Sequence, residues 1–118
     1  MKYLLITIGA LLFVGCEAKA PNGSVHIYAK HGDIALVKQH LAAGTDVNAT
    51  DEFLGMTILH DAVLGGQKEI VELLIAEGAD VNARGRVFLT PLDTALKASL
   101  NKEMADLLRK HGGKTGEE

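Results

Sequence analysis

Five histidines are the residues of this chain best suited to bind a metal ion: His26, His31, His40, His60 and His111. Two histidines on one face of a helix bind a common ion when they are four residues apart. His26 and His31 are five residues apart, and the chain contains no Cys-x-x-Cys pair. We therefore expect no metal and no other cofactor, with His31, His40 and His111 in solvent.

Two short patterns could support catalysis, but neither has the spacing that the chemistry needs. His60 and Asp61 are adjacent, so on a helix their side chains point about 100° apart and cannot act as an acid–base pair. The segment 113–115 (GKT) matches the end of a phosphate-binding loop, but Leu108 stands where that loop needs glycine. Because no set of nucleophile, base and oxyanion-binding groups is present, we expect no enzymatic activity.

Cys16 is the only cysteine of the chain, and it follows the apolar stretch 3–14. It could be a core residue, half of an intermolecular disulfide, a reactive thiol or an attachment point. Nothing near it in the sequence would lower the pKa of the thiol, which argues against a catalytic role. Residues 3–14 would span about 18 Å as a helix, whereas the hydrocarbon core of a membrane is about 30 Å thick.

A cationic start, a short apolar run and small residues at its end are typical of a secretory signal peptide. A buried strand or core helix is the alternative. Residues 13–16 (FVGC) resemble the lipobox of bacterial lipoproteins, with Gly15 as the small residue before the cysteine and Phe13 where leucine is usual. The resemblance implies cleavage before Cys16 and lipid on its sulfur; a plain signal peptide with a free cysteine is the alternative. Glu17, rather than aspartate, then favours the outer membrane, with the protein facing the periplasm.

The rest of the chain repeats itself with a period of 33 or 34 residues. Residues 43–49 recur at 77–83, residues 56–62 at 89–95, and residues 71–74 at 105–108. The residue pattern of each unit predicts a helix, a turn, a second helix and an extended loop. Thr57 and Thr90 are suited to cap the first helix, Pro91 suits its first position, and Gly78 should end the second helix in the left-handed conformation.

These motifs resemble ankyrin repeats, through TILHDA at 57–62, TPLDTA at 90–95 and GADVN at 78–82. The resemblance implies an all-α ankyrin-repeat solenoid of about three helix-turn-helix repeats. It implies that His60, and His26 at the equivalent position of the first repeat, hold their loops through hydrogen bonds. The residues expected to have structural roles are Thr57, His60, Gly78, Asp80, Asn82, Thr90 and Pro91.

We expect four segments along the chain. Residues 1–15 are a signal peptide that is removed, and residues 16–23 are the lipidated cysteine and a tether. The repeats occupy residues 24–113, divided at about 24–50, 51–84 and 85–113, and a disordered tail covers residues 114–118. Polar residues replace apolar ones in the outer repeats and should cap the two ends of the array against water: Gln39, His40, Arg109 and Lys110.

A formal net charge of −3 gives no electrostatic reason to expect a nucleic-acid partner. The ankyrin resemblance implies a protein-interaction module, which we expect to be a monomer anchored to the bacterial envelope and to bind a protein of unknown identity. An inhibitor or immunity protein of a specific exported enzyme is the alternative function.

By the same resemblance, a partner docks on the concave side, made by the loop tips and the first helices. The expected contact residues are Glu52, Phe53, Met56, Asp61, Leu64, Arg84, Arg86, Phe88, Thr94 and Lys97. Phe53, Arg86 and Phe88 are the preferred anchors, since aromatic residues and arginine dominate binding hot spots. The alternative is that Phe53 and Phe88 pack on adjacent loops.

Overall fold

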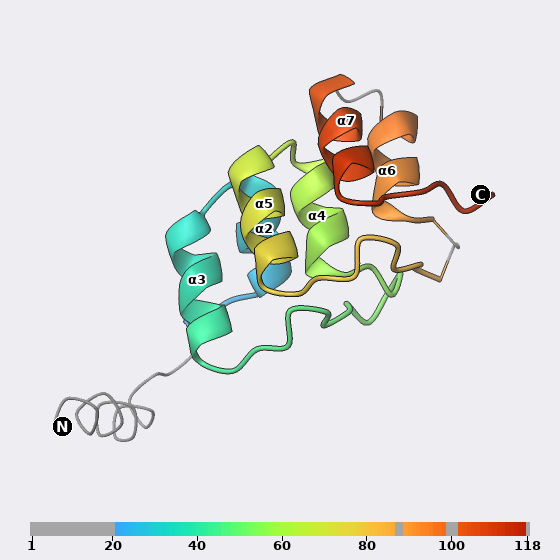
Figure 1. Ribbon diagram of the computed structural model, residues 1–118. Helices are drawn as coiled ribbons and strands as arrows, with labels where there is room; N and C mark the ends of the chain where they lie inside the picture. The colour runs from blue at the N-terminus through green and yellow to red at the C-terminus, as the bar shows by residue number, and fades with distance from the viewer. Residues whose placement is uncertain (1–20, 87–88, 99–101, 118) are drawn as a thin grey trace, which may run out of the picture.

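The structure is a computed structural model that describes residues 21–86, 89–98 and 102–117. These residues form three consecutive helix pairs and no strand: α2 (Val25–His31) with α3 (Ile34–Ala42), α4 (Ile58–Leu64) with α5 (Lys68–Ala76), and α6 (Pro91–Lys97) with α7 (Lys102–Lys110). Figure 1 shows the pairs stacked side by side, with the long loops gathered at one end of the helices. The predicted all-α solenoid of three helix-turn-helix repeats is confirmed.

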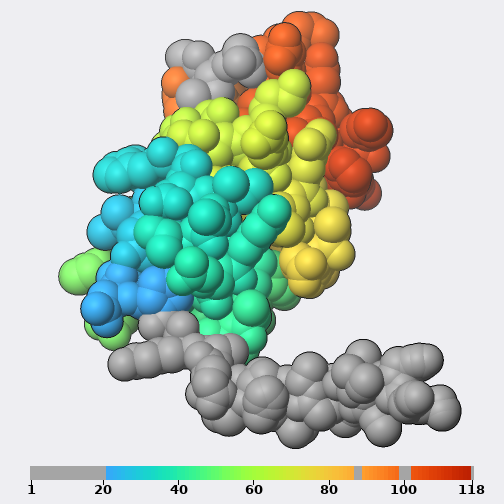
Figure 2. Space-filling model, turned by 90° about the vertical axis from the view of Figure 1, so that its left-hand side faces the viewer, coloured from blue at the N-terminus to red at the C-terminus, as the bar shows by residue number. Residues whose placement is uncertain are grey.

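The first helices form one row, in which α2 packs on α4 and α4 packs on α6, while each second helix packs on its own partner. Figure 2 shows the stack continuing without a break from the blue first pair to the red third pair. One apolar core runs through all six helices: Val25, Ala29, Val37, Ile58, Leu59, Ala62, Val63, Ile70, Val71, Leu74, Leu92, Ala95, Met104, Ala105, Leu107 and Leu108. Within the described part of the chain, no helix combines the length and apolar character needed to cross a membrane.

Each first helix begins at a capping hydroxyl. The side chains of Ser24, Thr57 and Thr90 accept hydrogen bonds from backbone N–H groups of the first turn that follows. These caps satisfy donors that have no partner within the helix. Because Ser24, Thr57 and Thr90 occupy the same position in their repeats, they also define which residues of the three repeats are equivalent.

This alignment corrects the position expected for His26. Since α2 begins at Val25, directly after its cap, the residue equivalent to His60 is Ile27. His26 instead stands where the other two repeats carry Leu59 and Leu92, whose side chains are fully buried. His26 therefore does not hold the loop of its own repeat.

His40 corrects a second expectation. It was expected to be solvated and to cap the first repeat, but its side chain is buried. The other three expected capping residues, Gln39, Arg109 and Lys110, are exposed. His40 lies on the inner face of α3, at the position that Leu74 and Leu108 occupy in later repeats, so its ring faces the core.

The segment 114–117 is held against the third repeat and is not the disordered tail that we expected. Lys114 donates its N–H to Oδ1 of Asn82 over 2.7 Å, and its carbonyl oxygen accepts a hydrogen bond from the hydroxyl of Thr90 over 2.7 Å. The N–H of Gly116 lies 2.8 Å from Oδ2 of Asp93. Polar groups of Asn82, Thr90 and Asp93 thus hold the chain after α7.

Candidate functional site

The loop at residues 51–55 is a tight turn organised around one carboxylate. Oδ1 of Asp51 accepts hydrogen bonds from the N–H groups of Phe53, Leu54 and Gly55, over 3.0, 2.7 and 3.1 Å. Burial opposes ionisation of this carboxyl, but the three backbone N–H groups together outweigh it, and the pKa of Asp51 is lowered from its usual 3.8. Asp51 is therefore charged at neutral pH and fixes the shape of the loop.

The tip of this loop presents apolar side chains to solvent. Phe53 is 82% exposed and Leu54 is 50% exposed. In Figure 2 the green residues of the loop protrude past α2 at the edge of the molecule. Phe53 does not pack on the adjacent loop, which excludes that alternative for this residue. Phe88 lies outside the described residues.

Arg86 joins the tip to the next loop. Its Nη1 donates to the carbonyl oxygen of Phe53 over 3.1 Å, and its backbone N–H donates to the carbonyl oxygen of Leu54 over 2.7 Å. Gly55 has a φ of +66°, and a Cβ at this position would lie 3.1 Å from Cγ of Arg86. The structure therefore brings two of the expected anchors, Phe53 and Arg86, into one exposed group.

The other expected contact residues divide by exposure. Four are exposed and two are buried: Glu52, Leu64, Arg84 and Lys97 face solvent, whereas Met56 and Thr94 lie in the interior. Asp61 is largely covered. The expectation that Met56 and Thr94 contact a partner is wrong, because both side chains face the packed interior of the stack.

His60 connects the start of α4 to the next repeat. Its Nδ1 accepts the N–H of Thr57 over 3.1 Å, so Nε2 carries the proton and donates to the carbonyl oxygen of Leu89 over 2.8 Å. Burial lowers the pKa of His60 below its usual 6.5, against the opposing effects of the Leu89 carbonyl and of the carboxylates of Asp61 and Asp51. His60 is therefore neutral at pH 7 and supports the neighbouring loops.

Asp93 occupies the equivalent position in the third repeat and accepts where His60 donates. Its Oδ2 accepts N–H groups from Thr90 over 3.1 Å and from Gly116 over 2.8 Å. Burial opposes ionisation of Asp93, but these hydrogen bonds, the hydroxyl of Thr90 and the charge of Lys97 lower its pKa from 3.8. Asp93, which stands where the second repeat carries His60, therefore accepts the backbone N–H that the tail presents at Gly116.

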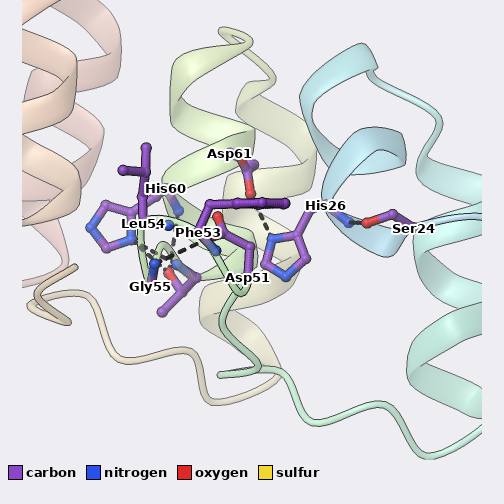
Figure 3. Close-up of polar contacts among 9 residues, drawn as sticks. Ser24, His26, Asp51, Phe53, Leu54, Gly55, His60 and Asp61 are labelled. Carbon is purple, nitrogen blue, oxygen red and sulfur yellow. Dashed lines mark hydrogen bonds and ion pairs between the residues drawn. The ribbon is translucent and has the colours of Figure 1, made fainter. Parts of the chain in front are cut away.

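A cluster of metal-ligating side chains lies between the first two repeats. Nδ1 of His26 and Oδ2 of Asp61 are 2.6 Å apart. One potential ligand atom from each of His26, Asp51 and Asp61 lies within 4.8 Å of the other two. Figure 3 shows these three side chains converging from α2, the loop and α4.

Sequence reasoning missed this cluster because it aligned His26 with His60 and did not consider Asp51. The available signal was a histidine in the first repeat at the position where the next two repeats carry leucine. This difference becomes visible when the first repeat is aligned with the others from its cap at Ser24.

A model of the ankyrin-repeat family matches residues 25–117 as three copies. The ankyrin repeat-containing protein P1E11.10 of Schizosaccharomyces pombe is 33% identical over 71% of this chain and 39% of its own length. The serine/threonine-protein kinase VIK of Arabidopsis thaliana is 35% identical over 82% of this chain and 22% of its own. The 2-5A-dependent ribonuclease of Mus musculus is 43% identical over 51% of this chain and 8% of its own. The chain thus spans well under half the length of each of these relatives.

Proposed function

Because the chain belongs to the ankyrin-repeat family, we propose that it is a protein-interaction module that presents loop 51–55 to its partner. Ankyrin repeats generally mediate protein–protein interactions, and the family is generally non-enzymatic. Stacked repeats of this kind bind through extended surfaces built from successive units. In this chain the contact surface consists of the loop tip with Phe53 and Leu54, the side chain of Arg86, and the exposed residues Leu64 and Lys97.

The exposure of Phe53 is the observation that carries this proposal. A phenylalanine that is 82% exposed contributes little to the stability of the fold. The carboxylate of Asp51 and the side chain of Arg86 hold its backbone in place, so little conformational entropy is lost when a partner covers the ring. Aromatic residues and arginine in such positions are typical binding hot spots.

A photo-crosslinking amino acid placed at position 53 tests the contact in cells. We expect it to capture one protein, which mass spectrometry then identifies. The matched control carries the same amino acid in place of Glu72, an exposed residue of α5 outside the proposed surface. Capture of the same proteins from both positions, or of none from position 53, would contradict the proposal.

The identified partner then allows the affinity to be measured. We expect Phe53→Ala to weaken binding by about 2 kcal/mol, or about thirtyfold in Kd, because a hot-spot aromatic side chain is lost. Since Phe53 is exposed, the melting temperature should stay unchanged. Equal affinity of Phe53→Ala and the original chain would remove loop 51–55 from the interface.

The second part of the proposal is a lipid anchor on Cys16 that holds the module at a bacterial membrane, with the outer membrane and a periplasmic orientation favoured. Its support is the sequence FVGC at 13–16 after an apolar stretch. Cys16 lies outside the described residues. Cells fed a tagged fatty acid should label the original chain but not Cys16→Ser, and equal labelling of both would disprove the anchor.

A further inference from the structure

Two of the three side chains in the cluster between the first repeats depart from the repeat pattern. His26 stands in place of Leu59 and Leu92, and Asp61 stands in place of Tyr28 and Thr94. Apolar residues at such positions stabilise a fold as well as a polar pair does, or better. The packing of the stack therefore does not require a histidine and a carboxylate here.

The three side chains come from separate elements and are mostly covered. His26 extends from α2, Asp61 from α4 and Asp51 from the start of the loop (Figure 3). The side chains of His26 and Asp61 are 16% and 17% exposed. Asp51 accepts its three backbone N–H groups at Oδ1, which leaves the other carboxylate oxygen for a ligand. The potential ligand atoms need to move by about an ångström to bind one ion, given metal–ligand distances of about 2 Å.

The cluster also carries more negative than positive charge. Three backbone N–H groups donate to Oδ1 of Asp51 and stabilise its charged carboxylate. In the described segments, no lysine or arginine forms an ion pair with Asp51 or Asp61, and the contact of Asp61 is with His26. A divalent cation would compensate the two carboxylates.

We propose that His26, Asp51 and Asp61 form a binding site for a divalent transition-metal ion of the zinc type. One imidazole nitrogen with two carboxylate oxygens suits zinc, whereas calcium and magnesium prefer oxygen ligands alone. Three protein ligands leave a fourth position for water. The bound imidazole must offer a lone pair to the ion, so metal binding replaces the hydrogen bond between His26 and Asp61.

Such an ion would join α2, α4 and the base of loop 51–55. It would therefore link the first repeat to the second and hold the start of the loop that carries Phe53. This site goes beyond the proposed protein interaction, and neither depends on the other. If the chain binds no metal, the crosslinking experiment at position 53 still tests the protein interaction.

Isothermal titration calorimetry with Zn²⁺ tests the site in the full chain carrying Cys16→Ser, which removes the only thiol. We expect one Zn²⁺ per chain and a rise in melting temperature on binding. His26→Gln should abolish binding, and Asp61→Asn should weaken it about tenfold or more, because each removes a ligand. The matched control is His111→Gln, which alters an exposed histidine and should bind as the parent does.

Co²⁺ absorption in the visible range provides a second measurement of the same variants, because a coordinating nitrogen and carboxylates change its spectrum. Circular dichroism shows whether each variant is folded. If His26→Gln fails to fold, Asp61→Asn decides, since an asparagine keeps the shape of the side chain. Absence of one-to-one binding by the parent, or unchanged binding in the folded ligand variants, would overturn the proposal.

Discussion

At the level of single residues, two buried histidines, His60 and His40, differ in how their ring nitrogens are hydrogen-bonded. His60 is fully buried, with hydrogen bonds at both ring nitrogens, to Thr57 and Leu89. His40 is buried too, but its Nε2 has no hydrogen-bond partner among the described residues, and its Nδ1 lies 3.4 Å from the hydroxyl of Thr45. The ring of His60 is therefore satisfied at both nitrogens, whereas burial of an unpaired nitrogen predicts a cost in stability at His40.

We predict that acid weakens the fold through His60. Burial lowers its pKa in the folded chain, whereas the unfolded chain takes up the proton near 6.5. Below that pH the unfolded chain binds more protons, so the free energy of unfolding falls as the pH drops, until the pKa of the folded state is reached. Nuclear magnetic resonance of the His60 ring should give a midpoint below 6.5. A midpoint above 6.5 would contradict this account.

The second prediction is that His40→Leu stabilises the protein. The substitution places at position 40 the residue found at Leu74 and Leu108, and it removes a buried nitrogen that has no partner in the described part of the chain. We expect the free energy of unfolding in urea to rise by about 1 kcal/mol. His111→Leu, at an exposed site, is the control and should have no such effect. A destabilised His40→Leu would mean that the contact between the Tyr28 and His40 rings outweighs the unpaired nitrogen.

At the level of the helices, two glycines that follow them are required for different reasons. Gly78 follows α5 with a φ of +99°, and a Cβ added there would meet no atom of the described segments within 4 Å. Gly65 follows α4 with an ordinary φ of −82°, but a Cβ there would lie 1.9 Å from the carbonyl oxygen of Lys30. Gly78 is needed for its backbone conformation, and Gly65 lets α2 and α4 approach closely.

We therefore predict that Gly65→Ala is more destabilising than Gly78→Ala. The strain of a left-handed alanine costs about 1 kcal/mol, whereas a Cβ against the backbone of α2 forces the two repeats apart and costs about 3 kcal/mol. Thermal melting of the two variants checks the order. Equal melting temperatures would show that the close contact at Lys30 yields without cost.

At the level of the whole molecule, the same hydrogen bonds link each loop to the next. Asn48 accepts the N–H of Asp80 over 2.8 Å, and Asn82 accepts the N–H of Lys114 over 2.7 Å. The tail after α7 thus makes the hydrogen bond to Asn82 that the loop of the next repeat makes to Asn48. It adds further hydrogen bonds to Thr90 and Asp93.

We predict that truncation after Gly113 weakens the third repeat selectively. The hydroxyl of Thr90 and the carboxylate of Asp93 would lose their bonds to the tail. Because each repeat contacts its neighbours alone, the effect should be strongest in α6 and weak in α2. Hydrogen exchange of the backbone amides should show faster exchange in α6. Uniform acceleration in all helices would show that the three repeats unfold as one unit.

The fold and its repeats could be predicted from the sequence because they depend on local patterns. The period, the capping threonines, Pro91 and Gly78 each act on their own turn of the chain, and the helices lie where these signals place them. The exposure of Phe53 also agrees with a loop-tip position. Such features require no knowledge of which residues meet across repeats.

The tertiary structure alone decided the features that depend on contacts between repeats. It placed His26 against Asp61 and Asp51, buried His40, fitted Gly65 against Lys30 and held the tail on Asp93. A shift of one residue in the alignment turns a helical side chain by about 100°, so the period alone does not say which side chains face the next repeat. That choice is made when the helices stack, because packing then fixes the position of each helix against its neighbour.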